Sequence, residues 1–134
     1  ETAVAVIEAG ADFVVSPVAD PGMIRECRRC GVLAAPGAFT PAEILRAWNE
    51  GADTLKVFPA TSLGPSYFKD LKGPFPDIRL MPTGGVTPAN ARSFLDAGAC
   101  CVGIGTARLD KALIAGERWD ELAERAESLM ASLR

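Results

Sequence analysis

Residues 50–59 read EGADTLKVFP, and they contain a helix end, a strand and the end of that strand. Gly51 suits the end of a helix, because glycine adopts the left-handed backbone that stops one. Residues 54–58 form a short apolar run typical of a strand, and Pro59 ends the run. The same order of glycine and then strand recurs at residues 9–12 (AGAD) and 97–100 (AGAC). The sequence therefore predicts a chain of repeated strand and helix units.

Five short runs of strand type alternate with amphipathic stretches. They begin about every 20–24 residues, the length of one strand and helix unit, which predicts a parallel sheet with right-handed crossovers. This is an α/β pattern, and periodicity alone fits a doubly wound sheet and a barrel equally well. The expected strands are 13–16, 32–35, 54–58, 78–81 and 100–104, and the expected helices are 2–9, 20–30, 41–50, 65–72, 88–97 and 119–133.

Three helix starts share one signal, a side-chain oxygen followed by proline. Asp20, Thr40 and Thr87 each precede a proline. The side chain can accept hydrogen bonds from the first turn, and proline fits the first helical position. The last helix carries an apolar face made of Leu122, Ala126, Leu129 and Met130.

The length of 134 residues suits about one domain. A net charge of −3 without a basic run argues against a general nucleic-acid binder, and the sequence contains no apolar stretch long enough to span a membrane. No histidine is present, so chemistry must use carboxylate, lysine, hydroxyl or thiol groups. The chain begins at Glu1 inside a helical pattern, which suggests a truncated or processed segment.

The four cysteines do not show the spacing of a zinc site or of a thioredoxin-type redox motif. Cys27 and Cys30 fall in a helical pattern, and Cys100 and Cys101 are adjacent in a predicted strand. Neighbours on a strand point to opposite faces, so Cys100 and Cys101 are not expected to hold one metal ion together. We expect buried or half-buried reduced thiols, and no metal or cofactor.

Lys56 is the residue most informative about chemistry. Strand alternation places Thr54, Lys56 and Phe58 on one face, away from Leu55 and Val57. A buried ammonium is costly, and this favours a neutral amine that can attack a carbonyl and form an imine. The alternative is a lysine at a strand end whose amine reaches solvent.

Glycine-rich turns follow two successive strands, at residues 83–85 and 103–106. Glycine lets backbone N–H groups approach an anion closely, and the helix that begins after Thr87 adds partial positive charge. Barrels often bind phosphate at the loops after their last two strands. The alternative is a pair of ordinary tight turns.

At these positions the sequence resembles the bacterial 2-keto-3-deoxy-6-phosphogluconate (KDPG) and 4-hydroxy-2-oxoglutarate aldolases. The resemblance rests on residues 55–60 (LKVFPA), 72–76 (KGPFP) and 81–86 (MPTGGV), and it extends from about Gly10 to the C-terminus. It implies a (β/α)8 TIM-type barrel, a cytoplasmic homotrimer and a lyase without metal or cofactor. The related 2-keto-3-deoxy-6-phosphogalactonate (KDPGal) aldolases share much of the pattern.

The resemblance implies a Schiff-base aldol cleavage by Lys56. The substrate would be KDPG, cleaved to pyruvate and glyceraldehyde 3-phosphate, and also 4-hydroxy-2-oxoglutarate, cleaved to pyruvate and glyoxylate. The residues matched to the substrate pocket are Pro17, Pro36, Phe58 and Thr83, and those matched to the phosphate loops are Gly84, Gly85, Gly105 and Thr106.

The sequence departs from the family at its N-terminus. Family members carry about three further strands, among them one with a general acid/base glutamate and a Gly-Ala-Gly-Thr stretch near the pyruvate carboxylate. We therefore expect residues 1–134 to be the C-terminal part of the barrel, with about five strands, and to be inactive alone. The alternatives are a KDPGal aldolase, a noncatalytic phosphate-binding segment, or a relative of epimerases or thiamine-phosphate synthase.

Overall fold

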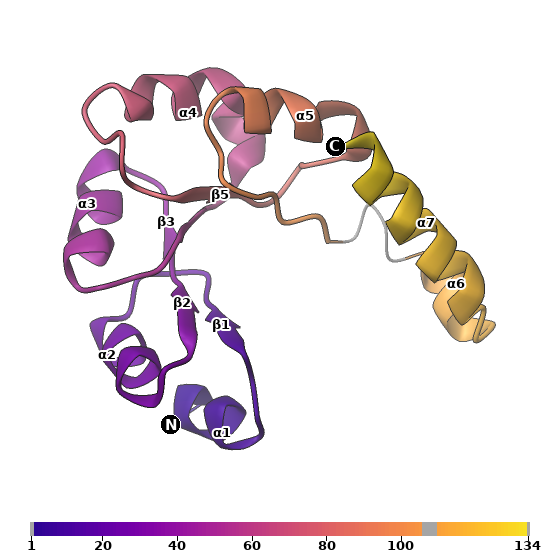
Figure 1. The fold of residues 1–134 in the computed structure, drawn as a ribbon, viewed down its shortest axis with the longest axis horizontal. Coiled ribbons are helices and arrows are strands. Elements are labelled where there is room, and N and C mark those ends of the chain that lie inside the picture. Colours follow the sequence, from indigo (N-terminus) through magenta and orange to yellow (C-terminus); the bar gives the residue numbers. More distant parts are fainter. Residues whose placement is uncertain (1, 106–109, 134) are drawn as a thin grey trace.

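The protein is an α/β structure with parallel strands, as expected from its repeated units (Figure 1). A computed structural model describes residues 2–105 and 110–133. The strands are β1 (Phe13–Val15), β2 (Leu33–Ala35), β3 (Gly37–Ala38), β4 (Leu55–Val57) and β5 (Leu80–Pro82). β1 pairs with β2, and β3, β4 and β5 pair in that order.

β2 and β3 are two parts of one strand interrupted at Pro36. The Asp53 N–H donates to the Ala34 carbonyl at 3.0 Å, and the Lys56 N–H donates to the Pro36 carbonyl at 2.9 Å. The Asp53 carboxylate also accepts from the Ala34 N–H at 2.8 Å. Hydrogen bonds to β4 thus continue across the interruption, so both pieces of sheet belong to one curved layer.

The expected helices are present, with boundaries close to the predicted ones. They are α1 (Thr2–Glu8), α2 (Pro21–Cys30), α3 (Pro41–Asn49), α4 (Gly64–Lys72), α5 (Pro88–Asp96) and α7 (Trp119–Ser132). Two further elements were not expected, a short 3-10 turn η1 (Ala60–Ser62) and the helix α6 (Lys111–Ala115). Asp20 accepts from the Gly22 N–H at 2.8 Å, and Thr40 with Glu43 forms a reciprocal capping pair. Proline stands in the first turn of α2, α3 and α5, so the proline signal is confirmed at all three starts. The side-chain cap is confirmed at Asp20 and Thr40, whereas Thr87 makes no side-chain cap hydrogen bond.

The run at residues 100–104 was expected to be a fifth strand, and this expectation was wrong. The structure has only a single parallel bridge there, between Thr83 and Gly103. The run has β5 as its neighbour on one side, with the Gly103 N–H donating to the Pro82 carbonyl at 2.9 Å. Gly103 and Gly105 weaken a strand whose one neighbour in the described part of the chain is β5.

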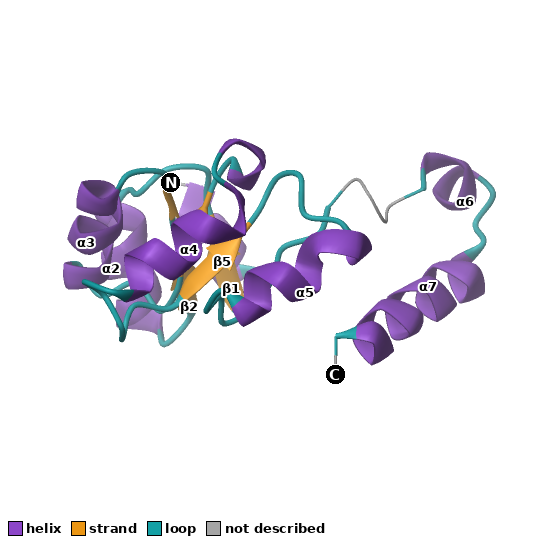
Figure 2. Ribbon diagram, turned by 90° about the horizontal axis from the view of Figure 1, so that it is seen from above, coloured by secondary structure: helices purple, strands orange, loops and turns teal. Residues whose placement is uncertain are grey.

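Helices α2 to α5 follow one another around the convex side of the sheet (Figures 1 and 2). Leu55, Val57 and Leu80 are fully buried on that side, together with Ile24, Ile44 and Phe68 from the helices. The concave side is open around β1 and β2, where Phe13 is 62% exposed and Leu33 is 56% exposed. A hollow of about 420 Å³ lies there, lined by residues that include Phe13, Val15, Leu33 and Met81. In the described residues the strands form an open arc and not a closed barrel.

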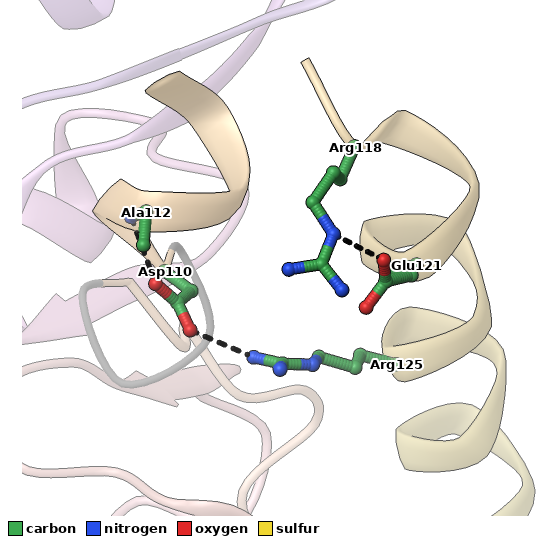
Figure 3. A network of polar contacts seen from close by, with 5 residues as sticks. All are labelled: Asp110, Ala112, Arg118, Glu121 and Arg125. Atoms are coloured by element: carbon green, nitrogen blue, oxygen red, sulfur yellow. Dashed lines mark hydrogen bonds and ion pairs between the residues drawn. The ribbon is translucent and has the colours of Figure 1, made fainter. Parts of the chain in front are cut away.

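Helices α6 and α7 form a pair joined by one ion pair, with a further polar contact at the start of each helix (Figure 3). Asp110 accepts from the Ala112 N–H at 2.9 Å and pairs with Arg125 of α7 at 3.2 Å. Arg118 pairs with Glu121 at the start of α7. α7 has no buried residue, and Met130 on its apolar face is 58% exposed. No helix in residues 2–105 and 110–133 is long and apolar enough to cross a membrane.

The expectation of buried or half-buried thiols holds only for Cys27, which is buried beside Met23. Cys30, Cys100 and Cys101 are exposed. Cys100 and Cys101 also have their sulfur atoms 3.7 Å apart, contrary to the expectation that they point to opposite faces. The physical reason is that they lie outside a regular strand, so strand alternation does not apply to them.

Candidate active site

Lys56 occupies the middle of β4, between β3 and β5. It is in register with Gly37 on β3 and with Met81 on β5. Its neighbours Leu55 and Val57 are buried against the helices, whereas the Lys56 side chain is half-buried on the opposite face. The Lys56 Nζ lies 4.7 Å from the centre of the Phe58 ring. The amine is therefore held over an aromatic face while it retains access to solvent.

The Lys56 amine opens into a pocket of about 310 Å³. The pocket is formed where β4, β5 and the run after α5 end on one side of the sheet. Its described lining residues are Lys56, Phe58, Thr83, Gly84, Gly85, Val86, Thr87, Gly103 and Gly105. This lining combines one amine, two hydroxyl groups and several glycines, and it includes no carboxylate among the described residues.

Gly84 and Gly85 form a turn that only glycine fits easily. Their φ angles are +80° and +74°, and a Cβ at Gly85 would lie 2.1 Å from Cγ2 of Thr61. Asn90 holds the turn in place, since its amide nitrogen donates to the Gly85 carbonyl at 3.0 Å and its oxygen accepts from the Thr87 N–H at 2.8 Å. Within the described part of the chain, neither Gly84 nor Gly85 donates its backbone N–H to a backbone carbonyl. Successive free N–H groups beside a helix start form an anion-binding concavity.

Thr83 connects this turn to the strands around Lys56. Its N–H donates to the Val57 carbonyl at 3.0 Å, and its carbonyl accepts from the Ala60 N–H at 2.8 Å. The side-chain Oγ1 is buried and has no hydrogen-bond partner among the residues that the structure describes. A buried hydroxyl without a partner is costly. The Thr83 hydroxyl is therefore available to a ligand in the pocket.

The residues singled out from the sequence are not all at one place. Phe58, Thr83, Gly84, Gly85 and Gly105 line the same pocket as Lys56. Pro17 lines a neighbouring pocket of about 370 Å³ that shares Phe58. Pro36 is fully buried, and its carbonyl holds the backbone of Lys56. Thr106 lies outside the described residues.

Val86 lines the pocket and was not singled out from the sequence, and Gly103 was predicted only as part of the turn at residues 103–106 and not as a site residue of its own. The sequence signal for Gly103 was its position two residues before Gly105. The structure shows why glycine is needed there, since a Cβ would lie 2.2 Å from Cγ2 of Thr83. Thr87 was interpreted only as a helix cap. Within residues 2–105 and 110–133, no cluster of three or more His, Cys, Asp or Glu residues is arranged to hold a metal ion.

A family profile described as KDPG and KHG aldolase matches residues 1–125. The chain belongs to this aldolase family. The 2-dehydro-3-deoxy-phosphogluconate aldolase of Pseudomonas aeruginosa is 39% identical to this aldolase chain over 117 residues, which are 86% of the chain and 53% of that relative. The 2-dehydro-3-deoxy-6-phosphogalactonate aldolase of Escherichia coli K12 is 33% identical over 126 residues, 93% of the chain and 60% of that relative.

A solved structure of an aldolase from the same family also matches. It is the KDPG aldolase of Legionella pneumophila with pyruvate captured at low pH as a covalent carbinolamine intermediate. The match has a TM-score of 0.82 at 26% identity, and it covers 92% of this chain and 61% of the other. The aldolase chain thus spans little more than half the length of its relatives. The relatives include both phosphogluconate and phosphogalactonate enzymes, so family membership does not select between these substrates.

Proposed function

We propose that this chain supplies the imine-forming lysine and the phosphate-binding loops of a metal-free class I aldolase that cleaves KDPG. The observation that carries the proposal is the pocket at Lys56, where one amine faces a glycine turn and the buried hydroxyl of Thr83, which has no partner in residues 2–105 and 110–133. The covalent pyruvate adduct of the Legionella relative supports the same chemistry.

In this mechanism the nitrogen lone pair of Lys56 attacks the keto carbon of the substrate. The carbinolamine that forms loses water and becomes a protonated imine, which withdraws electrons from the neighbouring carbon. The bond between C3 and C4 then breaks, and its electron pair moves toward the imine as the aldehyde leaves. The resulting enamine is protonated and hydrolysed, which releases pyruvate and restores Lys56.

Phe58 and Thr83 border the reacting carbons in this proposal. The Phe58 ring limits the room beside the Lys56 amine, and the Thr83 hydroxyl meets an oxygen of the substrate. Gly84, Gly85 and Gly105 hold the phosphate with their backbone N–H groups, and Thr106 is assigned to phosphate binding by the resemblance alone. Pro17 and Pro36 contribute to the entrance of the Lys56 pocket. Pro17 forms part of the entrance wall, and Pro36 acts through its carbonyl, which accepts from the backbone N–H of Lys56.

Proton transfer needs a group that the described pocket lining does not provide. We infer that a carboxylate on a further part of the barrel serves as general acid/base, as the resemblance implies. The same part would cover the exposed apolar face at Phe13 and Leu33, so that residues 1–134 form the C-terminal part of a barrel. The homotrimer and the cytoplasmic location implied by the resemblance belong to this proposal.

The test is a pyruvate-release assay coupled to lactate dehydrogenase. The chain is assayed alone and with the N-terminal part of the Pseudomonas relative added as a second polypeptide. Turnover is expected in the mixture, fastest with KDPG and slower with KDPGal and 4-hydroxy-2-oxoglutarate. The chain alone should be slower by about 10²–10⁴-fold, the usual contribution of general acid/base catalysis.

Two lysine variants separate the proposal from its alternatives. Lys56→Ala should abolish turnover in the mixture, whereas exposed Lys69→Ala should retain it. Full activity of the Lys56→Ala variant would refute the proposal. Stabilisation by phosphate that survives Lys56→Ala, without turnover by the unsubstituted mixture, would favour the noncatalytic alternative. Faster turnover of KDPGal than of KDPG would assign the phosphogalactonate alternative.

A further inference from the structure

Cys100 and Cys101 form a pair of exposed thiols at the end of β5 opposite the Lys56 pocket. The Cys100 N–H donates to the carbonyl of Leu80, the first residue of β5, at 2.9 Å. Its sulfur lies 3.5 Å from the Thr54 hydroxyl and 3.4 Å from the Leu80 carbonyl oxygen. The sulfur of Cys101 lies 3.7 Å from that of Cys100. Neither cysteine lines the pocket of Lys56.

This spacing is unsuited to a disulfide but suits a single atom held between the two sulfurs. Adjacent residues have Cα atoms about 3.8 Å apart, below the usual range of about 4.4–6.8 Å for a disulfide. A central atom with two sulfur bonds of about 2.3 Å, the length of a zinc–sulfur bond, holds its sulfurs about 3.3 Å apart at the near-right angle of a pyramidal atom and about 3.8 Å apart at a tetrahedral angle. The observed 3.7 Å between the sulfurs lies between these two spans.

The surroundings of Cys100 favour a thiolate, the form that binds soft atoms. The Cys101 thiol, the Thr54 hydroxyl, the backbone N–H of Cys100 and the charge of Arg79 lower the pKa of Cys100 to about 5, although desolvation opposes them. The pKa of Cys101 is raised by its contact with Cys100. One sulfur is therefore ready to bond, and the second can follow with loss of its proton.

We propose that Cys100 and Cys101 together bind a thiophilic centre that two sulfurs satisfy, and that monosubstituted trivalent arsenicals are the ligand class. A zinc ion would need further ligands, and among the described residues no third cysteine or carboxylate is placed to join the pair. An arsenical with one organic substituent needs only two sulfurs. Each sulfur forms one bond to arsenic, and the arsenic-bound oxygen leaves as water, with one proton from the Cys101 thiol and one from solvent because Cys100 reacts as a thiolate. Arsenic keeps its oxidation state, so the reaction needs no oxidant or reductant.

The other cysteine pair in the chain serves as an internal control. Cys27 and Cys30 are three residues apart on α2, but their sulfurs point to different partners. The Cys27 sulfur is buried and lies 3.6 Å from the sulfur of Met23. The Cys30 sulfur lies 3.8 Å from a carboxylate oxygen of Glu26. These two sulfurs are thus occupied separately and should not share one arsenic atom.

The experiment treats the chain with phenylarsine oxide in an excess of a monothiol and measures the adduct by intact-mass spectrometry. One phenylarsenic group per chain is expected, and a small dithiol should remove it. Cys100→Ser and Cys101→Ser should each lose the adduct, whereas Cys30→Ser and Lys56→Ala should retain it. Because Lys56→Ala abolishes imine formation, the two proposals can fail independently. Circular dichroism verifies that each variant is folded.

Any of three results would overturn the inference. The first is an adduct that survives the monothiol in a folded Cys100→Ser or Cys101→Ser variant, because a single sulfur would then be sufficient. The second is the absence of an adduct on the unsubstituted chain, and the third is the location of the adduct at Cys27 and Cys30 by peptide mapping.

Discussion

Replacement of Gly37 by alanine tests how closely β3 must approach the loop after β1. A Cβ at Gly37 would lie 2.0 Å from the carbonyl oxygen of Pro17, whereas ordinary contact begins at 3.4 Å. One of the two backbone segments must therefore move by about 1.4 Å, the difference between these distances. Gly37 also pairs with Lys56, so the movement would disturb the strand that carries the lysine. Overpacking of this kind typically costs about 1–3 kcal/mol, and the upper part of that range is expected because both segments are backbone.

The matched control for Gly37→Ala is Gly73→Ala. Gly73 ends α4 with φ −60°, and a Cβ there would lie 3.4 Å from the Asp70 carbonyl oxygen. This substitution should be neutral, or should stabilise by about 0.4–1 kcal/mol through the unfolded state. The assay is urea unfolding followed by far-UV circular dichroism. The unfolding midpoint of Gly37→Ala should fall by about 1 M, given typical urea dependences of about 1–3 kcal/mol per M. An unchanged midpoint, or an equal fall in Gly73→Ala, would refute this reasoning.

Three further predictions concern the core, the glycine turn and the thiol pair. Phe68→Ala should cost about 3–5 kcal/mol of unfolding free energy by urea unfolding, because Phe68 is fully buried and packs edge-on against Phe94 at 5.2 Å between ring centres. Tyr67→Phe, which loses one hydrogen bond to the Phe39 carbonyl, should cost only about 0.5–1.5 kcal/mol, and equal losses would contradict the packing argument. Inorganic phosphate should raise the melting temperature of the chain, and Gly85→Ala should remove that increase, whereas Gly31→Ala, also a left-handed glycine but remote from the pocket, should retain it. Alkylation of Cys100 by iodoacetamide should accelerate as pH rises through about 5, because the thiolate forms above its lowered pKa, and the inflection should return to about 8.5 in denaturant. An inflection near 8.5 in the folded chain would contradict the contacts described for Cys100.

The repeated units made most of the fold predictable from the sequence. Proline and capping residues fixed the helix starts, and glycines with positive φ follow α2, α3 and α5. Each of these signals lies within a few residues of one helix end, so it can be recognised without knowledge of the rest of the fold. The interruption of the second strand at Pro36 and the reduction of residues 100–104 to one bridge were not predicted. Both depend on which strand lies alongside, and this information is absent from a local pattern.

The candidate site was predictable at residues whose type alone indicates their chemistry or their backbone conformation. Lys56 stood out as a charge inside an apolar strand, and Gly84 and Gly85 stood out as a turn after the next strand. The contacts of Thr83 could not be read from the sequence, because they depend on the close approach of Gly103. The thiol pair was misinterpreted because strand alternation was assumed where the backbone is irregular. Its proximity to Thr54 and Leu80 depends on the packing of separate segments.

The most direct test of the central claim is borohydride reduction of the chain, mixed with the N-terminal part of the Pseudomonas relative, in the presence of saturating pyruvate, followed by peptide mapping. The proposed imine chemistry predicts a reduced pyruvate adduct on Lys56, with Lys69, Lys72 and Lys111 unmodified. The adduct should be absent from a folded Lys56→Ala variant. A folded chain in which Lys56 remains unmodified, or in which the label is spread evenly over the lysines, would contradict the assignment of Lys56 as the imine-forming residue.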